Sequence, residues 1–517
     1  MIEKLRAHDG QEWDIVVIGG GASGLGAALD AASRGYKTLL LEKVDFAKGT
    51  SSRSTKLIHG GVRYLAQGDI SLVYEALHER GLLMRNAPHL VSNQSFVIPN
   101  YDWWEMPYYT IGLKIYDYMA GKLGLGPSES ISKEETIEKI PNLKTEGLRG
   151  GVIYQDGQFD DSRLAVNLAQ TVAEQGGVVI NHFAVKALTK SEEGLISGVV
   201  GEDSETGEEF RISAKAVINA TGVFVDDILK MDEPNSRKTI VPSQGVHLVL
   251  DKEFLPGESA ILIPKTDDGR VLFAVPWCGK VVLGTTDTLV DTPSIEPRAL
   301  KKEIKFILKT AGDYLTRVPK KKDVKSVFAG LRPLAAPKAD GKKTKEISRG
   351  HKIVVGMSGL VTITGGKWTT YRKIGEDTVN QAAILADLEE KSSVTKSLAI
   401  HGHLKVHDPN LKYAHYGIDR EELIALAEVN EDFNQLLHPD LIFTKVEVVW
   451  AIRNEMARTI EDVLARRVRA LFLDAEASMI MAHSVSEIMA TELGWSEKKR
   501  ELELRKYLDL AEGYLIK

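Results

Sequence analysis

Apolar runs alternate with glycine-containing turns along the first part of the chain. Residues 13–18 (WDIVVI) are apolar and rich in β-branched side chains, which is typical of a buried parallel strand. The turn that follows carries glycines in the spacing G-x-G-x-x-G, namely Gly19, Gly21 and Gly24. Helical spacing of apolar residues continues over 25–33, and a second apolar run at 38–41 ends in Glu42. Together these segments predict a β-α-β unit.

The predicted β-α-β unit has the features of a dinucleotide site. Gly19 permits a tight turn, Gly21 lets backbone amides approach a pyrophosphate, and Gly24 lets the helix pack closely on the strand. The N-terminus of the helix favours phosphate charge, and Glu42 is placed to accept hydrogen bonds from ribose hydroxyls. The unit by itself is compatible with NAD as well as FAD.

Two later glycine-containing turns favour FAD. The segment 219–222 (NATG) closes the apolar run 216–218. The segment 364–367 (TGGK) follows the apolar run 359–363 and precedes a helical segment, which places another helix N-terminus near the ligand. Three separate returns of the chain to one ligand fit an extended FAD better than NAD.

The middle and the end of the chain differ in pattern. Apolar runs with strand character, separated by turn residues, lie at 239–250, 260–264, 271–275 and 280–285 and predict a second sheet. Cys278 lies between the last two runs and is expected to be a turn residue without a redox role. From about residue 400 onward helical spacing dominates, which predicts a helical C-terminal domain.

An arginine-rich segment in this domain admits two interpretations. If 449–471 is one helix, Ile452, Met456, Ile460 and Val463 form one face and three arginines lie opposite, namely Arg458, Arg466 and Arg469. In the alternative, Thr459 and Asp462 cap a new helix. A charged face of this kind is usually solvated, and contact with a membrane surface is the second possibility.

Composition limits the class of protein. A chain of 517 residues with 43% hydrophobic and 27% charged residues predicts a globular protein of two to four domains. The net charge of -6 argues against a nucleic-acid partner. Cys278 is the single cysteine, so no disulfide is expected, and no His, Asp or Glu cluster has metal-ligand spacing. No signal peptide and no apolar stretch of about 18 residues is found, so we expect a cytoplasmic protein without a spanning helix.

Several longer motifs carry a family resemblance. They are GTSSRSTKLIHGGVRYL at 49–65, HERGLLMRNAPHL at 78–90, FAGLRPL at 328–334, TGGKWTTYRK at 364–373 and RNEMARTIEDVLARRVRALFLD at 453–474. Through nearly its whole length the chain resembles the FAD-dependent glycerol-3-phosphate dehydrogenases.

The resemblance implies a fold and a division into domains. The fold is of the α/β class, with an FAD/NAD(P)-binding Rossmann-like domain of the glutathione-reductase-like superfamily, an antiparallel-sheet substrate domain and an all-helical C-terminal domain. The expected FAD-binding domain comprises 1–75, 150–225 and 350–390. The substrate domain comprises 76–149 and 226–349, and the helical domain comprises 391–517.

The resemblance also implies the chemistry. FAD, held non-covalently, oxidises sn-glycerol 3-phosphate to dihydroxyacetone phosphate by accepting hydride at flavin N5, and the electrons pass to a membrane quinone. The enzyme would then touch the inner face of the cell membrane peripherally, and a homodimer is compatible with the sequence. The residues expected at the cofactor, besides Gly19, Gly21, Gly24 and Glu42, are Ser51, Ser52, Lys56, Leu57, His59, Gly60, Val185, Ala220, Thr221, Gly222, Gly365, Gly366 and Thr369.

Substrate residues follow from the demands of the reaction and from the resemblance. A phosphate dianion requires Arg or Lys, and the candidates are Arg63, Arg332 and Lys367. His247 is the candidate general base because its ordinary pKa near 6.5 suits proton abstraction at neutral pH. The alternative interpretations are that each of these cations lies on the surface or forms a structural ion pair, and that His247 is a core histidine. Tyr64 is expected either to bond the substrate or to pack as an aromatic side chain.

Three other functions remain compatible with these motifs. A glycerol-3-phosphate oxidase would pass electrons to oxygen, although the insertion typical of such oxidases is not evident here. An amino-acid oxidase of the same superfamily would act on a substrate without phosphate. A non-catalytic FAD-binding protein would be favoured by the loss of His247, Arg332 or Lys367, and all three are present.

Overall fold

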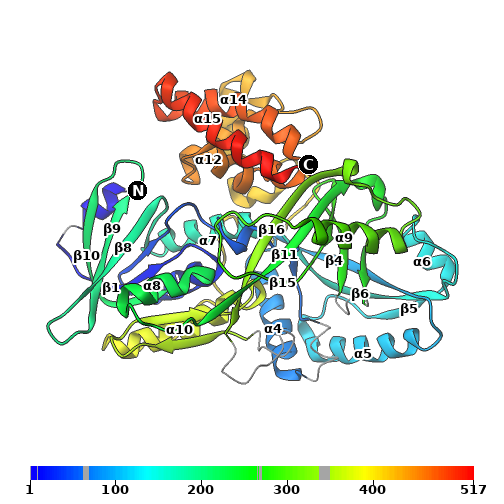
Figure 1. The fold of residues 1–517 in the computed structure, drawn as a ribbon, viewed down its shortest axis with the longest axis horizontal. Helices are drawn as coiled ribbons and strands as arrows, with labels where there is room; N and C mark the ends of the chain where they lie inside the picture. The colour runs from blue at the N-terminus through cyan, green and yellow to red at the C-terminus, as the bar shows by residue number, and fades with distance from the viewer. Residues whose placement is uncertain are drawn as a thin grey trace.

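The computed structural model describes residues 2–8, 10–61, 69–264, 266, 271–336 and 350–516. Two β-sheets lie side by side, and the C-terminal helices sit above the junction between them (Figure 1). Arg63 and Tyr64, which the sequence predicts at the substrate, lie outside the described residues.

The first sheet contains the predicted β-α-β unit. Its order is β17-β18-β10-β1-β2-β7, and all neighbours are parallel except β17 and β18. The strands are β1 (Trp13–Ile18), β2 (Thr38–Leu41), β7 (Val178–Ile180), β10 (Glu209–Asn219), β17 (Lys352–Val355) and β18 (Val361–Thr364). Since β1, β10 and β18 are neighbours, the three predicted glycine turns end adjacent strands at one edge of the sheet.

Strand β1 shows why both faces of this sheet are covered. Ile15 and Val17 share a buried core with helices α2 (Ala22–Ser33), α7 (Asp161–Glu174) and α10 (Tyr371–Leu385). The alternate residues Val16 and Ile18 share another with the antiparallel meander of β8 (Phe183–Lys190), β9 (Ile196–Asp203) and the first half of β10. Side chains alternate across a strand, so an uninterrupted apolar run is required here.

The second sheet is mostly antiparallel, in the order β15-β11-β14-β13-β12-β4-β6-β3. Its strands are β3 (Leu57–Ile58), β4 (Val91–Asn100), β5 (Glu129–Ile131), β6 (Gly150–Phe159), β11 (Ile240–Asp251), β12 (Ala260–Ile263), β13 (Leu272–Trp277), β14 (Lys280–Gly284), β15 (Thr288–Leu289) and β16 (Val324–Ala335). The four strand runs predicted between 239 and 285 correspond to β11 to β14. The predicted boundary at 150 assigns β6 to the FAD-binding domain, yet β6 pairs with β4 over its whole length.

Helices complete the periphery of both sheets. They are α1 (Ile2–Arg6), α4 (Ile70–Asn86), α5 (Glu105–Ala120), α6 (Lys133–Lys139), α8 (Val225–Asp232) and α9 (Lys301–Tyr314). Helices α4 and α5 lie at the end of the molecule opposite the C-terminal helices (Figure 1). Among the described residues, no helix has the length and apolar character needed to cross a bilayer.

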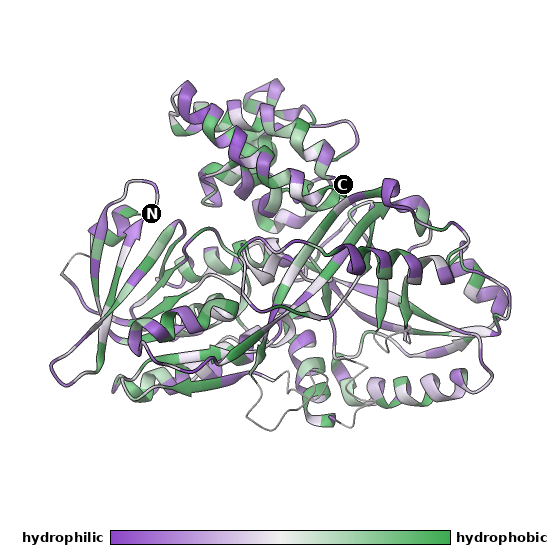
Figure 2. Cartoon of the chain, viewed as in Figure 1, coloured by the Kyte–Doolittle hydropathy of each residue, from purple (hydrophilic) through white to green (hydrophobic). Residues whose placement is uncertain are grey.

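The C-terminal part is helical, as the sequence predicts. It contains α11 (Arg420–Val429), α12 (Lys445–Asn454), a short π-helix (Asp462–Arg467), α13 (Ala470–Leu473), α14 (Ala475–Leu493) and α15 (Glu497–Ala511). Hydrophilic and hydrophobic residues alternate along α14 and α15 (Figure 2), and their apolar sides enclose a core that includes Met481 and Tyr507.

The prediction of one long helix over 449–471 is wrong, and the capping alternative is confirmed. Helix α12 ends at Asn454, and Thr459 and Asp462 cap each other: the Thr459 N–H donates to Asp462 Oδ2 (2.9 Å) and the Asp462 N–H to Thr459 Oγ1 (3.2 Å). Arg466 and Arg469 are each only 2% exposed. Arg466 is paired with Asp45, which follows β2, and Arg469 with Asp161, the first residue of α7, so these two arginines form no solvated or membrane-facing surface.

Candidate active site

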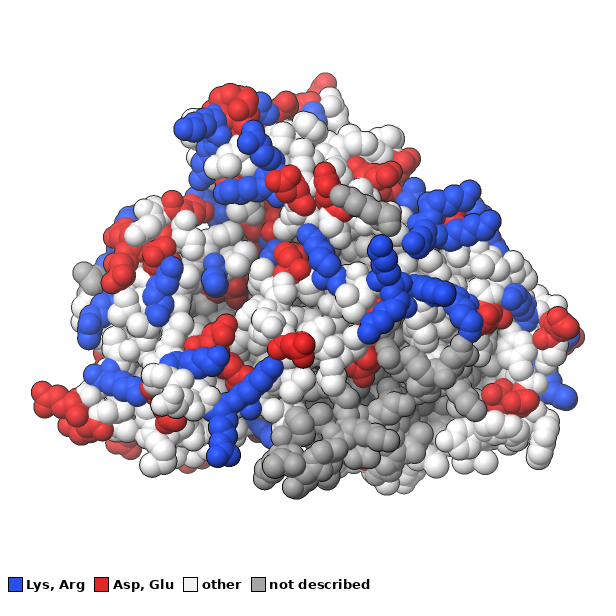
Figure 3. Space-filling model, in the orientation of Figure 1, with Lys and Arg blue, Asp and Glu red and all other residues white. Residues whose placement is uncertain are grey.

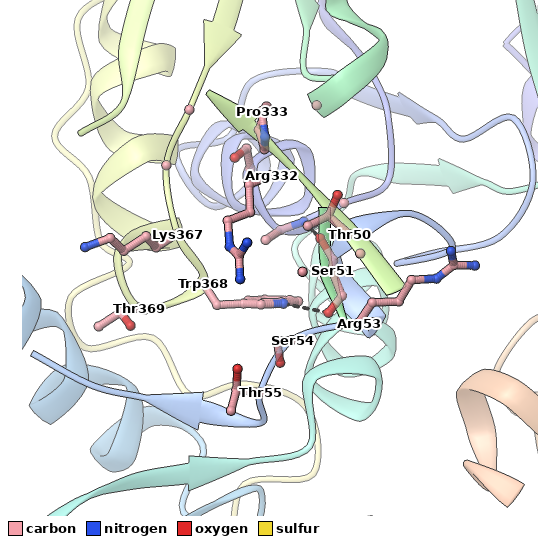
Figure 4. Close-up of a pocket in the computed structure, with 18 of the residues that line it drawn as sticks. Thr50, Ser51, Arg53, Ser54, Thr55, Arg332, Pro333, Lys367, Trp368 and Thr369 are labelled. Atoms are coloured by element: carbon pink, nitrogen blue, oxygen red, sulfur yellow. Dashed lines mark hydrogen bonds between the residues drawn. The ribbon is translucent and has the colours of Figure 1, made fainter. Parts of the chain in front are cut away.

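A cavity of about 1330 Å³ lies where the two sheets meet, and residues of both sheets line it. Its size exceeds the roughly 300–1,000 Å³ that is usual for a single small ligand. The turns after β1, β10 and β18 form one side, and β11 and β16 form the other. Figure 4 shows part of this wall, where Arg332 of β16 projects above Trp368 and the segment 50–55.

The glycine turn after β1 has the close packing that the sequence predicts. Gly19 has a φ of 109°, which only glycine adopts without strain. A Cβ on Gly24 would stand 1.9 Å from the Gly19 carbonyl oxygen, so helix α2 approaches the strand as closely as a glycine permits. Gly21 is the N-cap of α2 and supplies no side-chain cap, which is expected where a phosphate is the acceptor.

Glu42 directly follows β2 and lines the cavity. Its Oε2 accepts a hydrogen bond from the Gly20 N–H at 2.6 Å, and its Oε1 accepts one from the Val44 N–H at 2.9 Å. Burial raises the pKa of Glu42 above its ordinary value, and the two N–H donors oppose this shift. The carboxylate is thereby held in place on the cavity wall.

The turn after β18 contributes to the same side of the cavity. Gly365 and Gly366 both have positive φ, 75° and 93°, and bring the backbone to the cavity surface. Trp368 closes this turn, because its Nε1–H donates to the Ser51 carbonyl at 2.7 Å. The Ser51 side chain in turn accepts from the Ala22 N–H at 2.9 Å. The turn, the segment 50–52 and the start of α2 therefore form one hydrogen-bonded frame.

Most of the predicted cofactor residues line the cavity. They are Gly19, Gly21, Glu42, Ser51, Leu57, His59, Val185, Ala220, Thr221, Gly222, Gly365, Gly366 and Thr369. The cavity wall does not include Gly24, Ser52, Lys56 and Gly60. Gly24 supports the turn from behind, and Gly60 packs against Leu77 and Tyr116. Ser52 and Lys56 are buried, and Lys56 is paired with Asp161, so the structure does not place them at a cofactor.

His247 lies on β11 and faces the cavity. It is 2% exposed, its ring stacks on Phe328 with centroids 4.9 Å apart, and its Nε2 lies 2.9 Å from Thr55 Oγ1. Burial lowers the pKa of His247 well below its ordinary value, and the positive charges of Lys56 and Arg332 lower it further. The imidazole is therefore neutral at pH 7, which is the form that accepts a proton.

Arg332 lies on the same side of β11 as His247. A Cβ on Gly245 would stand 2.5 Å from Arg332 Nη2, so the guanidinium lies directly over Gly245, two residues before His247. Arg332 Nη1 donates to the Thr286 carbonyl and Nη2 to Thr285 Oγ1, both at 3.1 Å. These bonds aim the guanidinium while leaving the side chain 27% exposed toward the cavity.

Lys367 is the other described member of the predicted cationic set. It lines the cavity, but its side chain extends away from Arg332 (Figure 4). The structure thus brings His247 and Arg332 together and places Lys367 on a separate part of the wall.

Sequence reasoning missed several residues of the wall. Thr55 and Thr285 bond His247 and Arg332, and nothing in their local pattern distinguishes them from other threonines. Arg53 and Lys48 also line the cavity, and both pair with Glu296. Thr55 and Arg53 lie inside the motif at 49–65, and this position could have indicated from the sequence that they belong to the site. Within the described residues, no cluster of His, Cys, Asp and Glu could hold a metal ion, and Cys278 is a turn residue between β13 and β14, as predicted.

Comparison with known proteins identifies the family. A family model described as "FAD dependent oxidoreductase" matches residues 14–372, and one described as "C-terminal domain of alpha-glycerophosphate oxidase" matches residues 363–500. The chain is 40% identical to the probable mitochondrial glycerol-3-phosphate dehydrogenase of Caenorhabditis elegans, over 98% of this chain and 74% of that protein. It is 38% identical to the corresponding Saccharomyces cerevisiae protein, over 97% and 90% of the two chains. The chain belongs to the FAD-dependent glycerol-3-phosphate dehydrogenase family.

Solved structures agree with this family assignment. The glycerol-3-phosphate dehydrogenase of Bacillus halodurans, complexed with FAD, superimposes with a TM-score of 0.82 at 28% identity, over 100% of this chain and 97% of that one. The L-alpha-glycerophosphate oxidase of Mycoplasma pneumoniae shares the fold, with a TM-score of 0.58 at 17% identity over 74% of this chain and 96% of that one.

The cavity fits FAD, the cofactor of the family. The uncapped start of α2 suits a pyrophosphate, Glu42 suits a ribose, and a Cβ on Gly21 would stand 3.2 Å from Ser51 Oγ and narrow the approach. The positive-φ turn Gly365-Gly366 brings backbone to the surface of the same side of the cavity. The cavity therefore agrees with the α/β, FAD-binding fold that the sequence predicts.

Proposed function

We propose that this flavoenzyme oxidises sn-glycerol 3-phosphate to dihydroxyacetone phosphate and passes the electrons to a membrane quinone. The observation that carries the substrate assignment is that His247 and Arg332 lie on the same side of β11, in a cavity whose other wall suits FAD. Bound FAD supplies the two-electron acceptor for the hydrogen on the substrate carbon. The protein must then bind the phosphate and remove the hydroxyl proton.

Arg332 is the proposed phosphate ligand. Its guanidinium is pre-oriented by Thr285 and Thr286, so little side-chain entropy is lost when an anion binds. Arg63 remains a proposed partner of the same anion, and Tyr64 remains a proposed substrate contact. Lys367 remains a proposed cation of the site, but its side chain extends away from Arg332.

His247 is the proposed general base. A neutral imidazole accepts the hydroxyl proton as the carbon–hydrogen bond breaks, and Thr55 Oγ1 against Nε2 fixes the ring orientation. The positive charge of Arg332 disfavours a protonated imidazole in the resting site, but the phosphate dianion offsets that charge when substrate binds. Substrate binding therefore makes His247 a stronger base when it is needed.

Helix α5 supports the proposal of peripheral membrane contact. A stripe of large apolar side chains is exposed at helical spacing along it, namely Trp104, Tyr108, Ile111, Ile115 and Tyr118, and Trp103 beside them is 76% exposed. The inner side of the helix is buried through Leu113, Tyr116 and Ala120. Aromatic and aliphatic side chains on one exposed helix face are typical of an interfacial helix. The described surface at the lower right of Figure 3 is mostly free of Lys, Arg, Asp and Glu side chains.

The same helix connects the proposed membrane surface with the cavity. Tyr108, Ile111 and Ile115 belong to both the exposed stripe and the cavity wall. An apolar acceptor dissolved in the bilayer could therefore approach the cavity without crossing the aqueous surface. This arrangement favours a quinone over oxygen, which needs no such route. The proposed membrane contact thus lies on α5 instead of the arginine segment near residue 460.

An anaerobic half-reaction tests the proposal. The purified holoenzyme is mixed with glycerol 3-phosphate without oxygen, and bleaching of the flavin absorbance is followed. A short-chain quinone or oxygen is then added to the reduced enzyme. Bleaching by glycerol 3-phosphate but not by glycerol, followed by fast reoxidation by quinone, is the expected result. Fast stoichiometric formation of peroxide without quinone activity would establish the oxidase instead.

A further inference from the structure

Lys56 is buried beside the proposed active site without lining it. The side chain is 0% exposed, and its Nζ donates to Asp161 Oδ2 and to the Ser52 carbonyl, both at 2.7 Å. Its backbone has a φ of 64°, a left-handed conformation that costs energy for a residue other than glycine. Both the left-handed backbone and the buried charge of Lys56 cost free energy of folding. We therefore look for a functional role at this position.

The strained backbone separates the directions of two consecutive side chains. Thr55 faces the cavity, where its Oγ1 lies 2.9 Å from His247 Nε2. Lys56 points into the core behind the wall. The Phe159 N–H donates to the Lys56 carbonyl at 3.0 Å and holds this turn against β6. The anchoring of Lys56 therefore decides where the Thr55 hydroxyl lies.

The ammonium group of Lys56 also reaches the support of His247. It lies 5.2 Å from the ring centre of Trp277, 5.3 Å from that of Phe328 and 5.4 Å from that of Phe472. Phe328 is the ring on which His247 stacks, with planes only 17° apart. A buried positive charge and the imidazole thus contact the same aromatic ring.

Few charged groups surround Lys56 and His247. Lys56 faces Asp161 and, farther away, Asp160 and Arg469, while Arg332 is the other cation that faces His247. Strands β14 and β16 present Gly284 and Phe328 to the imidazole, which carry no charge. Burial and the charge of Arg469 lower the pKa of Lys56 to about 7, so below pH 6 the lysine is charged. That is the range in which an ordinary histidine would become protonated.

We propose that Lys56 is a positioning residue for His247: its anchored, left-handed turn sets the Thr55 hydroxyl against Nε2, and its ammonium places a positive charge behind the imidazole. The inference rests on the proposed role of His247 as the base. It assigns Lys56 a role other than contact with the cofactor.

The helical C-terminal domain contributes two residues to the surroundings of Lys56, Arg469 and Phe472. Arg469 Nη2 donates to Asp161 Oδ1 at 2.9 Å and to the Ser52 carbonyl at 3.1 Å, the same two residues that anchor Lys56. Phe472 belongs to the same helical segment. Asp161 would therefore keep a cationic partner if Lys56 lost its charge, so an uncharged variant should still fold.

The test is the pH dependence of kcat/KM in the holoenzyme. Lys56→Met keeps the length of the side chain and suits an aromatic cage, but removes the charge. Its acidic limb should move to higher pH by on the order of one unit, the scale of a nearby unit charge in a protein interior. Lys56→Arg should restore much of the wild-type profile. Lys280→Met is the matched control, because Lys280 is likewise buried and pairs with Asp251 away from His247.

A second readout separates this inference from the proposed function. In protein labelled with ¹⁵N-histidine, the His247 resonances, assigned by their loss in His247→Asn, should titrate at higher pH in Lys56→Met than in the wild type. An unchanged acidic limb and an unchanged His247 titration in a folded, yellow Lys56→Met protein would overturn the role of Lys56. If His247→Asn instead retains full turnover, the base assignment fails, whatever the titration shows.

Thr55→Val covers the case in which Lys56→Met fails to fold. It removes the hydroxyl that bonds Nε2 and leaves the lysine in place. The proposal requires a lower kcat with little change in KM. A wild-type kcat would show that the turn does not position the base and would overturn the proposal.

Discussion

Gly284 lies directly opposite His247 across the β11–β14 ladder, and a Cβ on Gly284 would stand 2.2 Å from the imidazole Cδ2. The glycine therefore creates the space in which the proposed base lies flat on Phe328. Any side chain at position 284 must displace the imidazole, because the atoms nearest to its Cβ all belong to the His247 ring.

Gly284→Ala should lower kcat for glycerol 3-phosphate by roughly 10²-fold, the effect of displacing a reacting group by about 1 Å. The visible flavin spectrum should change little, because Gly284 does not line the cavity. Steady-state kinetics with an artificial electron acceptor measures the effect. Gly279→Ala, in an open turn of the same hairpin, is the control for a glycine change as such. Equal kcat values for the two variants would show that the position of His247 does not limit the rate.

Arg332→Ala should raise KM for glycerol 3-phosphate far more than it changes the flavin spectrum. Loss of a buried guanidinium–phosphate pair costs roughly 2–5 kcal/mol. Glycerol lacks the phosphate and should be a poor substrate of the wild type, with a KM that is insensitive to the substitution. Arg237→Ala removes an exposed arginine and serves as the control. Similar turnover of glycerol and glycerol 3-phosphate by the wild type would refute the phosphate assignment.

Replacing apolar residues on α5 should release the protein from lipid vesicles. Trp103 and Tyr118 are 76% and 87% exposed and do not line the cavity, so Trp103→Ser with Tyr118→Ser weakens only the proposed interface. Co-sedimentation with anionic vesicles measures binding, and quinone reduction should fall with it. Val406→Ser with Val429→Ser changes equally exposed residues of the C-terminal part, 88% and 80% exposed, and should leave binding unchanged. If the Val406 and Val429 changes abolished binding while the Trp103 and Tyr118 changes did not, the membrane interface would lie on the C-terminal part.

The pair His182 and Asp462 should make stability depend on pH. Burial lowers the pKa of His182, but the charge and hydrogen bond of Asp462 outweigh this and raise it to about 9. A pKa that is higher in the folded state means that the stabilisation is fully present below about 6.5 and is lost as the pH rises toward 9. His182→Gln should therefore lower the free energy of unfolding by on the order of 1–3 kcal/mol at pH 6 and by much less at pH 9.5. Urea unfolding at both pH values measures the difference, and an equal loss at both would contradict the assignment.

The sequence by itself determined the nucleotide-binding architecture. The apolar run at 13–18, the glycine spacing and the helical periodicity that follows are local patterns, and each specifies its own backbone geometry over a few residues. The turns at 219–222 and 364–367 could be placed beside them because parallel strands end at a common edge of the sheet. Arg332 and His247 came instead from the resemblance to a known family, together with the reaction's need for a cation and a base.

Only the tertiary structure decided what the buried charges do. Arg466 and Arg469 carry the pattern of a solvated helix face, but their partners Asp45 and Asp161 lie more than 300 residues away, so no local pattern reveals the pairing. Lys56 lies inside a cofactor motif, yet a left-handed φ turns it into the core while Thr55 faces the cavity. The exposed stripe on α5 was likewise hidden, because an amphipathic helix looks the same whether its apolar face is buried or exposed. Pairing across the fold, backbone handedness and exposure are properties of the whole packed chain, and the local sequence does not specify them.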